Sequence, residues 1–107
     1  MIRHVVTWKL KDHAEGAPKA ANAARVKEVL EAMRGRVPGL RSLEVGVDVK
    51  LDPDAWDVVL VTELDDRAAF AVYQDHPLHL AAKLLIGKVR AERSAVDYET
   101  DGSSGSP

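Results

Sequence analysis

Apolar and polar side chains alternate over residues 2–10, which is the pattern of a strand with one buried face. The positions that would share this face are Ile2, His4, Val6, Trp8 and Leu10. Residues 43–51 alternate in the same way, and residues 89–99 form the last predicted strand. Residues 56–64 are apolar on both sides in their middle, which predicts a strand at the centre of a sheet.

Two helical segments are predicted between the strands. Pro18 suits the start of the first segment, and apolar residues at helical spacing continue to Val37, where Pro38-Gly39 would end the helix. Its charges are of mixed sign and would form a solvated face. Residues 12–16, before this helix, are predicted to form a loop.

The second helical segment follows the central strand. Asp65 or Asp66 can cap its start, and it carries Tyr73. The chain is predicted to restart as a helix at Pro77 and to leave it at Gly87.

The predicted order of elements is β-α-β-β-α-β. This order is that of an α+β, ferredoxin-like unit, in which right-handed crossovers place both helices on one face of a four-stranded antiparallel sheet. Residues 1–99 would form this single domain. Residues 100–107 are polar and rich in glycine and serine, and we expect them to form a disordered tail.

The helices would leave the other face of the sheet uncovered. The second, third and fourth strands carry valine and leucine, so this face would expose a large apolar patch. Pairing of two sheets would cover it, and the sequence therefore predicts a homodimer. A monomer at micromolar concentration in light scattering would contradict this prediction.

Composition narrows the range of partners. The 107 residues carry a formal net charge of −2, which provides no broad attraction to a phosphate backbone, so no nucleic-acid partner is expected. No apolar run could span a bilayer, and Arg3 interrupts what would be the core of a signal peptide, so we expect a cytoplasmic protein without a membrane partner. The lack of cysteine excludes disulfides and thiolate chemistry.

The segment Tyr73-Gln74-Asp75-His76-Pro77-Leu78-His79 holds the candidate chemistry. His79 could remove a proton from a carbon between two carbonyls if burial keeps its imidazole neutral. Tyr73 could donate a hydrogen bond to the oxygen on which charge develops. The pair requires the chain to turn at Pro77 so that both side chains point inward.

Structural roles compete with this chemistry. His76 precedes a favourable first helical residue and suits a capping position, and Tyr73 could be a core residue. His4 lies on an apolar strand face, where a buried, hydrogen-bonded histidine is the commoner outcome. His76 and His79 are spaced so that they could share a metal ion, but no HExxH pattern or cysteine accompanies them, and we expect no metal.

Several fragments in order resemble the stress-responsive A/B barrel domain (Dabb) family of the dimeric α+β barrel superfamily. These are Arg3-His4-Val5-Val6, Trp8-Lys9, Val37-Pro38-Gly39-Leu40, Leu43-Glu44-Val45-Gly46, Tyr73-x-x-His76-Pro77-x-His79 and Val96-Asp97-Tyr98. The resemblance implies a dimeric α+β barrel.

One plant branch of this family contains polyketide cyclases that close a poly-β-keto chain by aldol condensation without a cofactor. The resemblance implies His79 and Tyr73 as catalytic residues, and His4 and His76 as substrate-binding residues. The central strand reads Asp57-Val58-Val59-Leu60 and lacks the further polar pocket residue of those enzymes, which implies a different substrate pocket.

Three kinds of function follow as hypotheses. The first is a cofactor-independent cyclase or lyase acting on a small β-keto or phenolic compound. The second is a non-catalytic, stress-associated dimer with a filled pocket, and the third is a carrier of an apolar ligand. A haem- or quinol-type monooxygenase of the same superfamily is a further alternative.

Overall fold

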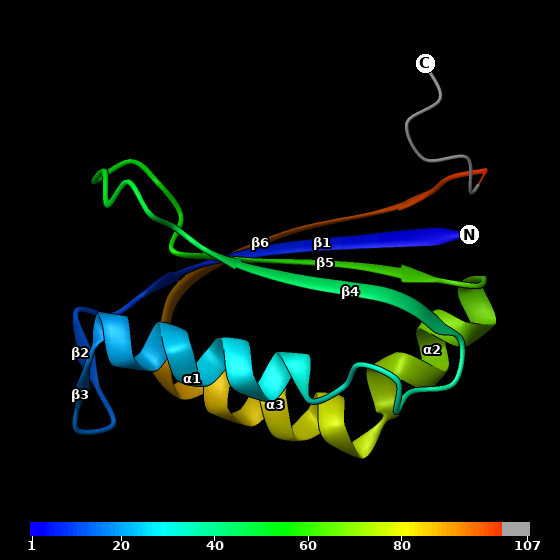
Figure 1. Cartoon of the computed structure of the whole chain (residues 1–107), viewed down its shortest axis with the longest axis horizontal. Helices are drawn as coiled ribbons and strands as arrows, with labels where there is room; N and C mark the ends of the chain where they lie inside the picture. The colour runs from blue at the N-terminus through cyan, green and yellow to red at the C-terminus, as the bar shows by residue number, and fades with distance from the viewer. Residues whose placement is uncertain (102–107) are drawn as a thin grey trace.

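The structure, a computed structural model, describes residues 1–101 and has one layer of helices below one layer of strands (Figure 1). The strands are β1 (Ile2–Leu10), β2 (His13–Ala14), β3 (Ala17–Pro18), β4 (Leu40–Val47), β5 (Val58–Leu64) and β6 (Arg90–Glu99). The helices are α1 (Lys19–Glu31), α2 (Arg67–Asp75) and α3 (Pro77–Val89). The predicted tail continues beyond the described residues.

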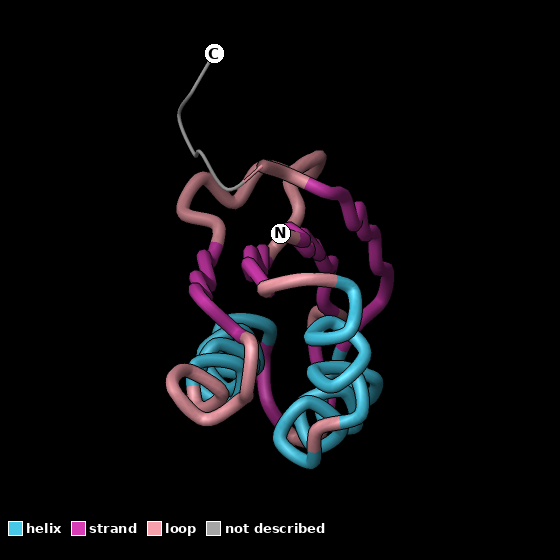
Figure 2. Tube along the Cα trace, turned by 90° about the vertical axis from the view of Figure 1, so that its right-hand side faces the viewer, coloured by secondary structure: helices cyan, strands magenta, loops and turns pink. Residues whose placement is uncertain are grey.

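The main sheet has the order β4-β5-β1-β6, and all its neighbouring strands are antiparallel. Figure 2 shows that the helices lie on one side of the curved sheet. This arrangement confirms the predicted ferredoxin-like fold. It also confirms the predicted central strand, since β5 lies between β4 and β1, although this strand begins at Val58 and not at Trp56 as predicted.

Alternation on β1 fixes which side chains face the helices. The buried side chains of β1 are Ile2, His4, Val6, Trp8 and Leu10. Val58, Leu60 and Leu64 of β5 are buried on the same side. Burial of these faces against the helices forms the core, and it leaves Val5 and Val61, which are register partners, on the open side.

The first helix is shorter than predicted. Its last residue is Glu31, and residues 32–36 form turns in which backbone N–H groups donate to carbonyls three residues back, as from Met33 to Leu30 at 3.1 Å. Gly35 adopts a φ of 75°, which a helix does not allow. Met33 and Val37 are buried as expected, but through these turns.

Two further boundaries differ from the predictions. Residues 12–16 were expected to form a loop, but β2 and β3 make a small hairpin whose turn places Glu15 and Gly16 at φ values of 51° and 74°. Positive φ at both central turn residues matches the twist of a tight hairpin. The second predicted strand ends early at Val47, because the Asp48 carboxylate accepts a hydrogen bond from Leu51 N at 2.8 Å and turns the chain.

The second helical segment follows the predicted pattern at its start. Asp66 caps α2, with its carboxylate accepting a hydrogen bond from Ala69 N at 2.8 Å. The expected end at Gly87 is wrong, because α3 continues to Val89. Ile86 and Val89 are buried against the core, and this packing outweighs the roughly 1 kcal/mol cost of a helical glycine.

Candidate functional site

A cavity of about 420 Å³ lies between the sheet and the helices. It is bounded by side chains from β1, β5 and β6 and from all three helices. Its aromatic and ionisable lining residues, together with one glycine, are His4, Trp8, Tyr73, His79, Lys83, Gly87, Arg90 and Arg93. Aliphatic side chains such as Val6 and Ile86 complete its wall. Ionisable groups and apolar groups therefore line one cavity.

Tyr73 and His79 meet at this cavity. Their ring centroids are 4.6 Å apart, with an angle of 49° between the ring planes. The two residues belong to different helices, and the extended backbone of His76 (φ −66°, ψ 138°) between α2 and α3 redirects the chain. The break before Pro77 thus provides the turn that the pairing requires.

The Nδ1 atom of His79 makes a hydrogen bond to the backbone. Its Nδ1 lies 3.0 Å from the carbonyl oxygen of Gln74, and because a carbonyl can only accept, Nδ1 must donate. The neutral ring then carries its lone pair on Nε2. Burial lowers the pKa of His79, the Gln74 carbonyl opposes this shift, and the positive charges of Lys83 and Arg93 add to the lowering. The ring is therefore suited to act as a neutral base.

The lowered pKa of His79 predicts a pH-dependent stability. Below an ordinary imidazole pKa of 6.5 the unfolded chain takes up a proton that the folded His79 resists, so stability is present above this pH and is lost as pH falls towards the folded pKa. We expect His79→Gln to flatten the dependence of the unfolding midpoint on pH between about 7 and 5. Urea unfolding of both proteins across this range measures the difference, and parallel curves would contradict it.

Tyr73 is fully buried, and within the described part of the chain its hydroxyl has no hydrogen-bond partner. Burial raises the pKa of the phenol, the negative charge of Asp97 raises it further, and Arg93 opposes them. The hydroxyl therefore stays protonated at neutral pH. Tyr73 lines the cavity, and its hydroxyl is a buried donor without an acceptor among the described residues.

His4 joins this cluster from β1. Its ring centroid lies 5.7 Å from that of Tyr73 and 5.1 Å from that of Phe70. Its Nδ1 makes a short contact with the carboxylate of Asp97, the residue opposite His4 on β6. His4 is thus both a buried, hydrogen-bonded residue and part of the cavity wall. Asp97 was not predicted as a site residue, although the fragment that contains it was noted.

His76 does not line the cavity. Its Nδ1 accepts a hydrogen bond from Leu78 N at 3.1 Å, so the ring caps the start of α3. We therefore assign His76 the capping role. Its contribution to the site is the break between the helices, which places Tyr73 beside His79.

Sequence reasoning missed the positive charges at the cavity. Lys83 follows His79 by one helical turn on α3, while Arg90 and Arg93 come from the start of β6. The signal in the sequence was the helical spacing of Lys83 from His79, and nothing local indicated that β6 would bring Arg93 to the same place. Over residues 1–101, no three histidine, aspartate or glutamate side chains gather as a metal site would require, and no helix is long and apolar enough to cross a membrane.

Comparison with known proteins places this chain in a family. The model of the stress responsive A/B barrel domain matches residues 2–100. An uncharacterised protein of Streptomyces coelicolor is 34% identical over 85 residues, which cover 79% of this chain and 86% of that protein.

Solved structures agree with this match. A dimeric ferredoxin-like protein of unknown function from Thermobifida fusca is 30% identical with a TM-score of 0.80, over 92% of this chain and 90% of that one. A dimeric ferredoxin-like protein of unknown function from Bacteroides fragilis is 29% identical with a TM-score of 0.78, over 92% and 95% of the two chains. The chain therefore belongs to the stress-responsive A/B barrel domain family.

Proposed function

We propose that this protein is a homodimeric enzyme that moves protons on a small carbonyl compound, with acid-base chemistry of the polyketide-cyclase type. One observation carries the proposal: a histidine nitrogen held ready to accept a proton lies beside a buried, unpartnered phenol on a single cavity. Geometry of this kind is what general acid-base catalysis requires.

The proposed reaction begins at a carbon between two carbonyls. His79 Nε2 removes a proton from this carbon, and the electron pair of the C–H bond moves to a carbonyl oxygen as an enolate. Tyr73 donates a hydrogen bond to that oxygen, where the negative charge develops. The enolate carbon then forms a bond to a second carbonyl carbon of the same substrate, and the new alkoxide takes back the proton that His79 holds.

His4 and Asp97 support this chemistry from the sheet. Because His4 Nδ1 contacts the Asp97 carboxylate, the orientation of the ring is fixed, and it packs against Tyr73 and Phe70. We propose His4 as a substrate-facing residue and Asp97 as the residue that positions it.

The lining of the cavity favours an enzyme over the other hypotheses. A carrier of an apolar ligand would have a mainly aliphatic wall with one or two polar contacts. Here the wall includes a tyrosine, two histidines and three cationic side chains. A filled pocket, which the assembly hypothesis predicts, does not fit a volume of about 420 Å³.

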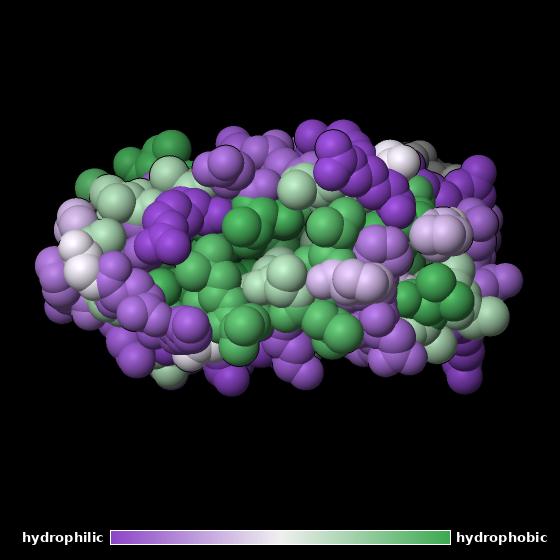
Figure 3. Space-filling model, turned by 90° about the horizontal axis from the view of Figure 1, so that it is seen from below, coloured by the Kyte–Doolittle hydropathy of each residue, from purple (hydrophilic) through white to green (hydrophobic). Residues whose placement is uncertain are grey.

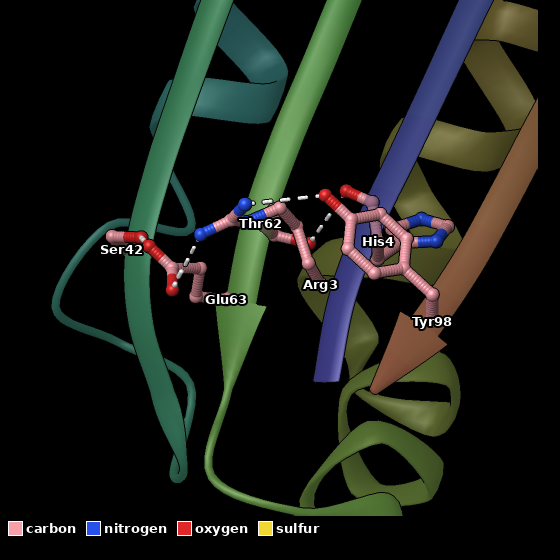
Figure 4. A network of polar contacts seen from close by, with 6 residues as sticks. All are labelled: Arg3, His4, Ser42, Thr62, Glu63 and Tyr98. Atoms are coloured by element: carbon pink, nitrogen blue, oxygen red, sulfur yellow. Dashed lines mark hydrogen bonds and ion pairs between the residues drawn. The ribbon is translucent and has the colours of Figure 1, made fainter. Parts of the chain in front are cut away.

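The open face of the sheet supports the homodimer. Val5, Val61 and Val96 form one row across three strands of this face. Figure 4 shows polar side chains at one end of it, where Arg3 donates to the hydroxyl of Tyr98 at 3.2 Å and to Glu63 at 3.4 Å. An apolar centre with a polar rim is typical of a protein interface.

Hydrogen-deuterium exchange tests the proposed chemistry without knowledge of the natural substrate. In mildly acidic heavy water, we expect the native protein to accelerate exchange of the central protons of acetylacetone, as followed by proton NMR. His79→Gln should lower this acceleration by about 100-fold or more, since it removes the base. His13→Gln removes an exposed histidine outside the cavity and should leave the rate unchanged. Equal rates for the native protein and His79→Gln would refute the proposal.

A further inference from the structure

Three cationic side chains surround one part of the cavity. Lys83 follows His79 by one turn of α3, whereas Arg90 and Arg93 come from the start of β6, where Arg93 lies opposite Trp8. Among the described residues, none of these three side chains makes a hydrogen bond or an ion pair. The lining of the cavity therefore contains three cationic side chains and no carboxylate of its own, since Asp97 contacts His4 from outside the lining.

This charge acts on the candidate catalytic residues. Lys83 and Arg93 both disfavour a proton on His79, and Arg93 lowers the pKa of the Tyr73 phenol against the stronger effect of burial. Like charges that face one cavity repel one another, and an anion placed among them would relieve this repulsion. It would also ease proton uptake by His79 during the reaction.

The backbone leaves room for such an anion. Gly87 lines the same part of the cavity, and a Cβ atom built on it would meet no atom within 4 Å. On the helix, Gly87 lies about 12 Å from His79, and Lys83 lies midway between them. Arg93 and Asp97, four residues apart on β6, are separated by about 13 Å. The cavity thus has an acid-base end at His79 and a cationic end towards Gly87 and Arg93, about 12 Å apart along the backbone.

We propose that the ligand of this protein is a carbonyl compound with a carboxylate, bound with its carboxylate between Arg90, Arg93 and Lys83 and its reacting carbonyls between His79 and Tyr73. Guanidinium groups bind carboxylates through paired, charge-assisted hydrogen bonds. The cationic end therefore sets the orientation of the ligand. This inference rests on the proposed function for the position of the carbonyls, but the carboxylate contact can be tested without turnover.

A matched pair of probes tests the carboxylate contact. Succinylacetone is a β-diketone that ends in a carboxylate, and its methyl ester has the same diketone without the charge. Both can be titrated into the native protein by calorimetry, with the fluorescence of the cavity residue Trp8 as a second readout. We expect the acid to bind about 10-fold to 100-fold more tightly than the ester, and this preference to shrink as salt is added.

Variants locate the contact. The double change Arg90→Gln with Arg93→Gln should reduce the preference for the acid to about 2-fold or less while the affinity for the ester stays as in the native protein. Arg25→Gln removes an exposed cation of α1 that does not line this cavity and should keep the full preference. Because all these side chains are exposed, thermal unfolding should show that each variant is folded.

The binding measurements can overturn the proposed carboxylate contact in three ways. Equal binding of acid and ester by the native protein, binding of neither probe, or an unchanged preference in the double variant would overturn it. His79→Gln should keep the preference for the acid. Acid preference without any catalysed exchange of acetylacetone would therefore refute the proposed function alone, whereas catalysed exchange without acid preference would refute this inference alone.

Discussion

Replacing Tyr73 by phenylalanine is expected to stabilise the protein and to remove most of the proposed activity. The hydroxyl of Tyr73 is buried and, within residues 1–101, has no hydrogen-bond partner, so the folded state loses the interaction with water that the unfolded chain retains. An unsatisfied buried polar group of this kind costs about 1–3 kcal/mol. Phenylalanine keeps the ring that packs against Phe70 and His4. We expect the free energy of unfolding to rise by about 1 kcal/mol.

The same change should slow the chemistry by about 100-fold or more, since it removes the donor for the developing enolate. Chemical denaturation and exchange of acetylacetone protons, measured on one protein sample, give both quantities. Tyr98→Phe is the matched control, because Tyr98 lies outside the cavity and its hydroxyl accepts a hydrogen bond from Arg3. Loss of stability with full activity in Tyr73→Phe would show that the hydroxyl serves the fold alone.

Introducing a charge at Val61 is expected to separate the proposed dimer into monomers. Val61 lies on the open face of the central strand β5, and Val5 is its partner on β1. In a dimer formed through this face, Val61→Asp would bury a carboxylate without a partner, which costs several kcal/mol. In the monomer the same carboxylate faces water.

Size-exclusion chromatography with light scattering at micromolar concentration measures this effect. We expect a dimer for the native protein and a monomer for Val61→Asp. Leu84→Asp is the control, because Leu84 is an exposed apolar residue of α3. It belongs to the helix side, where Figure 3 shows apolar side chains gathered within a polar border. If Val61→Asp remained dimeric, or if only Leu84→Asp dissociated, the dimer would not form through the open face of the sheet.

Local sequence patterns predicted helices and strands correctly where burial of apolar side chains determines the structure. The alternation of β1 and the doubly apolar middle of β5 both reflect burial, so both strands lie where the sequence places them. Alternation at Val49 and Leu51 was misleading. These side chains are 94% and 79% exposed, because turn residues end the strand before them. Gly87 was also misleading, because it predicted the end of a helix. Tertiary packing extends α3 beyond Gly87 to Val89.

Some residues of the candidate site could likewise be predicted from the sequence, and others could not. Tyr73 and His79 could be found from the sequence because they lie in one short segment, and the break before Pro77 brings their rings together. Asp97 and Arg93 could not be assigned, because their places opposite His4 and Trp8 depend on the register of β6 against β1. Register between strands from the two ends of a chain is set by the whole fold.

The rate of acetylacetone exchange as a function of pH, measured for the native protein and for His79→Gln, tests the central claim most directly. If neutral His79 is the base, the catalysed rate should rise with pH through one ionisation below the ordinary imidazole pKa of 6.5 and then reach a plateau. This step should be missing in the variant. A native profile that matches buffer alone, or a step that persists without His79, would contradict the claim.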